Sequence, residues 1–295
     1  MTRHTTKRVA LTTQDDPRTR AASGTVPRAS TGWGLAVISM ILLAASHTPI
    51  LAEAQEPAPT AETKAPAATN RIDPKAQQLL DQCVLALGGN AFLNAKSLRT
   101  EGRSFSITED STSGLAKYES VVAYPAKRRL SYGKGTPVTL INDGERGWQL
   151  DRYGLIRQPP EQVRLWNLRS RYTYESLLRT VFREQGLLIQ HSGTEFIGPL
   201  STHVISITDS SQTQIKIYLD AKRSLPAQVK YRVQNPKTRE WEEFAEIYSD
   251  FREFQEIMTP MQITSFLDGE RTGETFRKSA EYNVEIPPNY FTPGG

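Results

Sequence analysis

The stretch LPAQVKYRV, residues 225–233, identifies the dominant secondary structure of the chain. Its residues alternate between two faces: Leu225, Ala227, Val229, Tyr231 and Val233 on one, and Gln228, Lys230 and Arg232 on the other. A period of two is that of a β-strand with one buried face. The stretch TQIKIYLD, residues 213–220, precedes it and ends at Asp220, a residue that favours turns. Together the two stretches predict an antiparallel hairpin.

Runs of the same kind recur along the chain, separated by Pro, Gly or Asn-Asp. They cover residues 118–124, 128–132, 137–141, 147–150, 202–208, 243–249, 261–267 and 276–284. A spacing of about ten residues is typical of antiparallel strands joined by short turns. We therefore expect one large antiparallel sheet.

A helix is expected where the folded part begins. Asp73 is a good N-cap, and Pro74 suits the first helical position. Apolar residues then follow at helical spacing until Gly88 and Gly89 end the helix: Ala76, Leu79, Leu80, Cys83, Val84 and Leu87. Cys83 is the only cysteine, so no internal disulfide can form. We interpret it as a small buried hydrophobe within this stripe.

Residues 159–186 predict two further helices that interrupt the strands. Thr173 can cap the second one, in which Tyr174, Leu177, Leu178, Val181 and Phe182 form an apolar stripe before Gly186. The predicted fold class is thus α+β: a large curved antiparallel sheet, an N-terminal helix, and a helical insertion that covers the concave face of the sheet.

The N-terminal part is expected to direct export. Six basic residues before Gly32 are followed by an apolar run at residues 33–45 and by Ala52-Glu53-Ala54. This pattern indicates a secretory signal peptide, residues 1–54, cleaved after Ala54. The alternative is an uncleaved inner-membrane anchor formed by residues 33–52. Residues 55–72, rich in Pro, Ala, Thr and Glu, are expected to be a disordered linker, and residues 73–295 one folded domain.

Charge does not point to a polyanionic partner. Of the 36 basic residues six precede Ala54, and of the 32 acids three do, which leaves 30 and 29 in the exported part. No basic run interleaved with aromatic residues occurs, so nucleic-acid binding is not expected.

No short motif nominates a catalytic, cofactor or metal site. His191 and His203 have no ligand at metal-binding spacing, and neither a G-x-S-x-G elbow nor a phosphate-binding loop is present. Glu240, Glu242, Glu243 and Glu246 are interpreted as a solvated sheet face. The stretch LINDGERGWQLDRYG, residues 140–154, is interpreted as two turns with a strand between them, with Trp148 facing the concave side. We expect no enzyme and no cofactor, although a hydrolase on such a sheet stays open.

Several stretches, in this order, resemble the LolA/LolB-like outer-membrane lipoprotein-sorting superfamily, in a divergent exported form. They are ALGGNAFLNAKSLRTEGR (86–103), YPAKRRLSY (124–132), INDGERGWQL (141–150), IKIYLDAKRSLPAQVKY (215–231) and YSDFREFQEIMTPMQITSFLDGE (248–270). The resemblance implies a half-barrel of about eleven antiparallel strands, closed by helices around an apolar cavity for acyl chains. No position matches the carrier's functional arginine, and no cysteine follows the apolar run as lipid anchoring would require.

The resemblance implies a periplasmic carrier or chaperone, non-catalytic and monomeric, that binds lipid or lipoprotein acyl chains. The alternative is an envelope interaction or sensor module, which residues 33–52 would anchor in the inner membrane if they are not cleaved. Its partner would be an envelope lipoprotein or another membrane partner. Metal ions are not expected at the site. We expect the cavity to be lined by Tyr118, Val122, Leu130, Tyr132, Trp148, Leu150, Leu177, Val181 and Phe182.

Overall fold

The computed structural model describes residues 69–108, 111–112, 115–235 and 238–294. The predicted signal peptide or anchor and most of the predicted linker lie outside these residues. The last linker residues belong to the fold, because Arg71–Ile72 (β1) pairs in parallel with Leu188 and Ile189. The folded part therefore begins just before the predicted boundary at Asp73.

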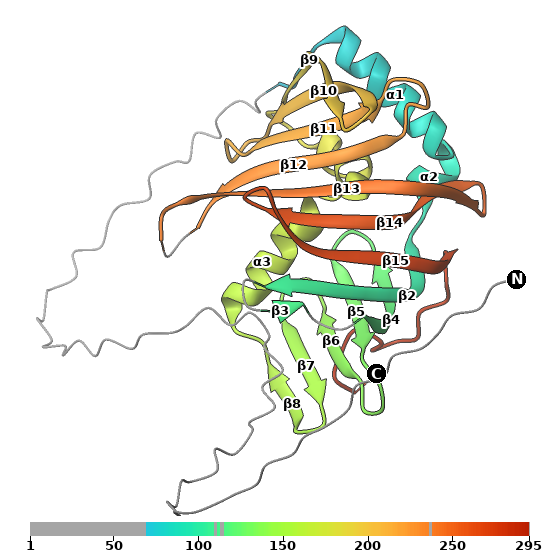
Figure 1. The fold of residues 1–295 in the computed structure, drawn as a ribbon, viewed down its shortest axis with the longest axis vertical. Helices are drawn as coiled ribbons and strands as arrows, with labels where there is room; N and C mark the ends of the chain where they lie inside the picture. The colour runs from blue at the N-terminus through green and yellow to red at the C-terminus, as the bar shows by residue number, and fades with distance from the viewer. Residues whose placement is uncertain (1–68, 109–110, 113–114, 236–237, 295) are drawn as a thin grey trace, which may run out of the picture. The chain divides into compact units, whose positions relative to one another are not determined.

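Within the described residues, fifteen strands form one sheet (Figure 1). After β1 they are Ser97–Thr108 (β2), Ser111–Thr112 (β3), Ala116–Ala123 (β4), Lys127–Tyr132 (β5), Val138–Asn142 (β6), Gly147–Asp151 (β7), Gly154–Arg157 (β8), Leu188–Ile197 (β9), Leu200–Thr208 (β10), Gln214–Asp220 (β11), Pro226–Gln234 (β12), Trp241–Phe254 (β13), Ile257–Leu267 (β14) and Glu270–Tyr282 (β15). The helices are Pro74–Leu87 (α1), Asn90–Asn94 (α2), Pro160–Arg171 (α3) and Tyr174–Arg179 (α4), followed by the 3-10 helix Val181–Arg183 (η1). The predicted fold class is confirmed.

The sheet joins the two halves of the sequence through one strand pair. Its order runs from β1 and β9 through β15, then to β2, β4 and on to β8. Thus β15, the last strand, pairs antiparallel with β2, the first long one. At this junction Gly102 lies opposite Arg277, next to an irregularity in the register of β15. A Cβ on Gly102 would lie 2.0 Å from the carbonyl oxygen of Phe276, so only glycine fits.

The N-terminal helix follows the prediction at both ends. The Asp73 carboxylate accepts a hydrogen bond from the Lys75 backbone N–H at 2.8 Å, and Pro74 opens α1. Gly88 ends the helix with a left-handed φ of 119°, a conformation that L side chains rarely adopt. Cys83 is completely buried, and its burial raises the pKa of its thiol. Its interpretation as a core residue is confirmed.

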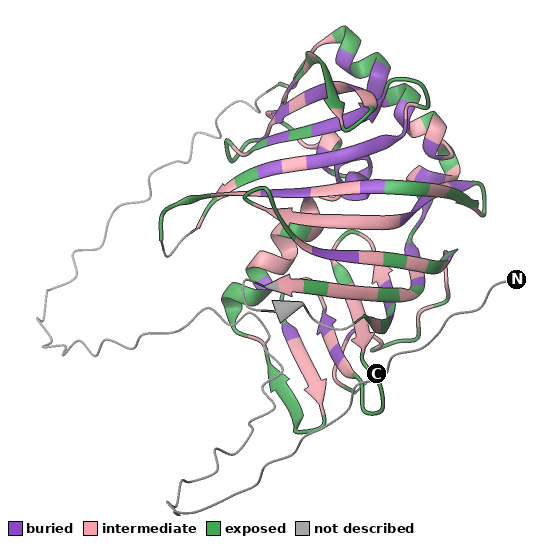
Figure 2. Cartoon of the chain, in the orientation of Figure 1, coloured by how far each residue is buried: buried purple, intermediate pink, exposed green. Residues whose placement is uncertain are grey.

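The main core lies between the helices and strands β9 to β13. Register places Ile205, Ile217 and Val229 in one row on the inner face, where all three are buried. They belong to the same cluster as Leu79 of α1 and Leu177 of α4. Figure 2 shows this concentration of buried residues in β10–β12, whereas β7 is mostly intermediate and β8 exposed.

The helical insertion spans the concave side from one half of the sheet to the other (Figure 1). On α3, the Arg169 guanidinium lies 5.2 Å from the ring centre of Phe244 on β13, and the Trp166 ring lies 4.9 Å from the guanidinium of Arg128 on β5. Thr173 caps α4 as predicted, accepting a hydrogen bond from the Ser176 N–H at 3.3 Å. None of the helices in the described residues is both long and apolar enough to cross a bilayer.

A smaller core occupies the opposite face of the sheet. Val121 and Ile141 are buried there with Phe291, and Trp148 and Tyr290 pack against them. The segment after β15 therefore covers the outer face of β4, β6 and β7, which fixes the inner face of these strands as the one toward α3.

Replacing Gly102 with alanine tests the strand junction. We expect Gly102→Ala to lower the free energy of unfolding by about 2–3 kcal/mol, because the added methyl group must displace the backbone of β15. Ser104→Ala is the matched control on the same strand, since it adds no atom and loses only the hydroxyl contact with Thr275, a cost of about 1 kcal/mol. Urea denaturation measures both, and equal effects would contradict the close approach.

Candidate functional site

The inner face of the sheet changes character along the strand order. On β10 to β12 the inner face is aliphatic. On the strands that follow in the order of the sheet, from β13 through β15 and β2 to β5, it carries charged groups and phenols. We call these residues the concave polar cluster: Tyr118, Arg128, Glu246, Tyr248 and Arg277 of the sheet, with Tyr174, Glu175 and Arg179 of α4. Register explains the convergence, because Arg277, Gly102 and Tyr118 are successive partners across β15, β2 and β4.

Few of these groups are hydrogen-bonded to one another. The Tyr248 hydroxyl donates to the Glu246 carboxylate at 2.8 Å, and Arg128 Nε donates to the Ser120 hydroxyl at 2.9 Å. Arg277 Nη1 donates to the carbonyl oxygen of Pro260 at 3.1 Å. The rings of Tyr174 and Tyr248 meet edge to face with centroids 4.8 Å apart, which ties α4 to β13.

The cluster perturbs the pKa values of its members. Burial raises the pKa of the Glu246 carboxyl, and Glu175 adds to the increase, against the opposing effects of Tyr248, Arg169 and Arg128. Burial lowers the pKa of Arg128, and the charge of Arg277 lowers it further. Burial also acts to lower the pKa of Arg277, but Glu175 and the tyrosines Tyr174, Tyr118 and Tyr282 together outweigh it, so that this pKa is raised. Arginine remains charged in every case.

These residues lie deep in the protein without being sealed from solvent. Desolvation is the largest influence on Arg128, Glu246 and Arg277, yet all three keep an intermediate exposure of the side chain. These groups are thus surrounded by many protein atoms while water still reaches part of each residue.

Four of the predicted lining residues share this inner face. Tyr118 and Tyr132 are register partners on β4 and β5, and Leu130 and Val122 lie on the same side of these strands. Tyr118 is buried, whereas the other three are intermediate in exposure. These four are brought together beside the concave polar cluster.

The placement of Trp148 on the concave side was wrong. Trp148 pairs with Ile141, and Leu150 with Thr139, so both belong to the face that the C-terminal segment covers. A strand pattern gives the alternation of two faces but not which face is inside. The remaining three lie in the insertion: Leu177 and Val181 are fully buried core residues, and Phe182 lines a separate cavity.

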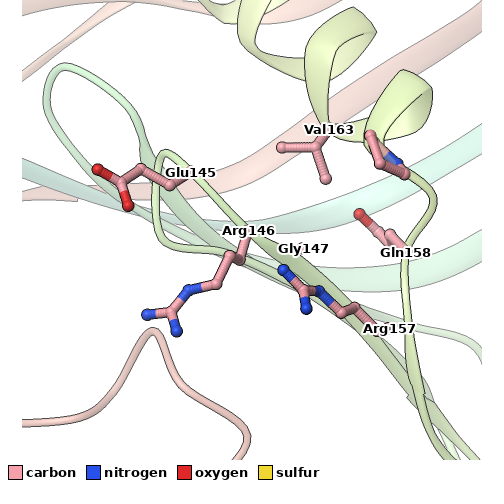
Figure 3. Close-up of a pocket in the computed structure, with 7 residues that line it drawn as sticks. Glu145, Arg146, Gly147, Arg157, Gln158 and Val163 are labelled. Atoms are coloured by element: carbon pink, nitrogen blue, oxygen red, sulfur yellow. The ribbon is translucent and has the colours of Figure 1, made fainter. Parts of the chain in front are cut away.

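Two cavities lie elsewhere on the described part of the chain. One of about 510 Å³ lies between α1, α2 and η1. Its apolar lining includes Leu80, Val84, Leu93, Leu178 and Phe182, and polar residues of the same elements also line it. The other, of about 400 Å³, lies where β8 leads into α3 (Figure 3). Glu145, Arg146 and Arg157 are among the residues that line it. The loop before it is the predicted turn, in which Asp143 accepts hydrogen bonds from the backbone N–H groups of Glu145 and Arg146.

Sequence reasoning missed the charged members of the concave polar cluster. Glu246 was assigned to a solvated face, but it lies on the inner face between Phe244 and Tyr248. The alternation of these three residues carried the signal, as did that of Arg128 with Leu130 and Tyr132. No comparable signal marks Arg277, because the register irregularity beside it breaks the alternation.

Metal binding finds no support in the described residues, since no group of three or more His, Cys, Asp or Glu side chains lies close enough to hold an ion. His191 and His203 do meet edge to face, with ring centroids 5.5 Å apart.

Comparison with known proteins places the fold. No family model matches the sequence, and no curated protein is detectably similar to it. Several solved structures, however, are similar to this chain. A DUF1329 family protein from Desulfovibrio piger has a TM-score of 0.50 at 11% identity, and the match covers 74% of this chain and 98% of that one. A LolA superfamily protein from Nitrosomonas europaea has a TM-score of 0.48 at 14% identity with the same coverage. A putative outer membrane lipoprotein-sorting protein domain from Vibrio parahaemolyticus has a TM-score of 0.46 at 10% identity, again with that coverage.

The likeness to the Desulfovibrio piger structure, at 11% identity, is a likeness of fold alone. At such low identity the likeness says nothing of what this chain binds. The class defined by fold and site is a curved antiparallel sheet with a helical insertion and an accessible inner face.

The raised pKa of Glu246 predicts a dependence of stability on pH. The folded protein holds this proton to a higher pH than the unfolded chain, whose glutamate titrates near 4.5. The contribution of Glu246 to stability is therefore complete below that value and is lost as the pH rises through the folded pKa. Glu246→Gln keeps an acceptor for Tyr248 and removes the titration.

We expect the stability of Glu246→Gln relative to the wild type to increase as the pH rises above about 4.5. Urea denaturation across the weakly acidic to neutral range measures this difference. Glu253→Gln, at an exposed position on the same strand, controls for the loss of one glutamate. A constant difference between Glu246→Gln and wild type at every pH would contradict the burial of this carboxyl.

Proposed function

We propose that this protein is a non-catalytic carrier that binds an acyl chain on the inner face of its sheet. The observation that carries the proposal is the state of Val122, Leu130 and Tyr132. They face inward, toward the side that α3 spans, yet they keep part of their surface exposed. Inward-facing apolar groups that the fold does not cover offer a site for an apolar ligand.

Acyl burial requires little more than apolar area. Each Å² of apolar surface removed from water contributes about 25 cal/mol, so a few hundred Å² support binding after the ligand's ordering costs. The fold likeness to a domain described as lipoprotein-sorting agrees with this chemistry but does not identify the ligand. We infer that lipid or lipoprotein acyl chains are the ligands, and that the carrier works in the periplasm.

A charge placed on the inner face tests the carrier directly. We expect Leu130→Glu to weaken uptake of a fluorescent fatty acid at least about tenfold, because burying an acyl chain against a carboxylate leaves the charge poorly solvated. Leu155→Glu is the matched control, since it makes the same change at a side chain 50% exposed on β8.

Circular dichroism establishes that both variants fold, and titration with the fluorescent fatty acid measures binding. Unchanged uptake by a folded Leu130→Glu variant, or no uptake by the wild type, would contradict the proposal.

Export with removal of residues 1–54 is part of the proposal. N-terminal sequencing of the protein recovered from the periplasm is expected to begin at Gln55. A protein that stays in the membrane fraction with residues 33–52 intact would instead support the anchored interaction module.

A further inference from the structure

Arg179 is a buried guanidinium whose nitrogens have no acceptor in good hydrogen-bond geometry. Burial lowers the pKa of this guanidinium, but the neighbouring Tyr124 hydroxyl and Glu175 carboxylate raise it. The residue is 7% exposed, and its Nε, Nη1 and Nη2 all lie buried with no acceptor among the described residues. A buried hydrogen-bond donor without an acceptor costs free energy, and the cost is larger when the donor belongs to a charged group.

Two aromatic rings hold the Arg179 side chain in place. Its guanidinium carbon lies 4.2 Å from the ring centre of Phe92 and 4.1 Å from that of Tyr124. Such contacts engage the faces of the guanidinium plane. The N–H groups lie within that plane, in the fork geometry that matches a carboxylate or phosphate.

The other unpartnered polar atoms around the inner face are mostly donors too. They are the hydroxyls of Tyr118 and Tyr174, Nε1 of Trp166 and Nδ2 of Asn142. Among the described residues of this region, Oδ1 of Asn167 is the unpartnered atom that can only accept, whereas the two hydroxyls can donate or accept. A ligand group that only accepts hydrogen bonds fits this set, and ionised carboxylates and phosphates are such groups.

The charges of the concave polar cluster favour the same kind of ligand. The cluster contains three arginines, Arg128, Arg179 and Arg277, and two acids, Glu175 and Glu246. Burial raises the pKa of Glu246, which favours its neutral form. None of these arginines forms an ion pair within 4.0 Å in the described part of the chain. One added negative charge would bring the cluster closer to neutrality.

We propose that Arg179, with the hydroxyl of Tyr174 nearby, binds the carboxylate or phosphate group of an amphiphile whose acyl chain lies along the inner face. The proposal rests on the carrier function and names the class of its ligand. Tyr124, which stacks on Arg179, follows β4 two residues after Val122, so the anion site adjoins the apolar lining.

The test compares ligands that differ only in the head group. Nile red, a neutral dye, reports occupancy of the apolar site in the full-length wild-type protein, at a pH where palmitate is ionised. We expect palmitate and hexadecyl phosphate to displace the dye at a concentration about tenfold or more below that of methyl palmitate, as charge-assisted hydrogen bonds imply.

Variants assign the preference to Arg179. Arg179→Gln is expected to weaken displacement by palmitate about tenfold and to leave displacement by methyl palmitate unchanged. Arg164→Gln, at an exposed position on α3, is the matched control and is expected to behave as the wild type. If Arg179→Gln does not fold, Arg179→Lys keeps the charge without the fork and is expected to lose part of the preference.

The outcomes separate this inference from the carrier function. Equal displacement by palmitate and its methyl ester in the wild type would overturn the anion site and leave the carrier standing. A folded Arg179→Gln variant that keeps the preference would overturn the role of Arg179. Thermal stabilisation by inorganic phosphate in the wild type, with no displacement by any lipid, would indicate a free-anion site and overturn both the amphiphile and the carrier.

Discussion

The pairing of β15 with β2 is the contact on which the rest of the structure depends. It joins strands from opposite ends of the folded chain, and it makes one continuous sheet from two that would otherwise be separate. Only on such a sheet can α3 contact both halves, through Arg169 with Phe244 and Trp166 with Arg128. Gly102 permits the close approach of the two backbones, because it has no side chain to collide with β15. The geometry of the inner face therefore depends on this glycine.

The two parts of the inner face serve different purposes. The aliphatic rows of β10 to β12 are filled by α1 and α4 and supply the burial that stabilises the fold. The concave polar cluster cannot serve the same end, because buried charges with few partners cost free energy. We propose that these groups act on a ligand. An amphiphile, with its chain against Leu130 and its anionic group at Arg179, would use both properties of this surface.

The sequence allowed the elements to be predicted more surely than their arrangement. The caps at Asp73 and Thr173 and the alternation in residues 225–233 are local signals, and the structure confirms them. The β15–β2 pair joins residues far apart in the chain, and nothing local specifies it. The same limit explains the error at Trp148, since alternation does not say which face is inside. Charged residues such as Arg128 and Glu246 became meaningful only once their strands were known to face inward.

Native mass spectrometry of the full chain, recovered from the periplasm of a bacterial host, tests the central claim most directly. The account predicts a mass above that of the polypeptide by that of an acyl lipid, and the extracted lipid should carry a carboxylate or phosphate. A polypeptide mass without lipid, unchanged after incubation with palmitate, would contradict it, because the inner face would then be closed to ligands.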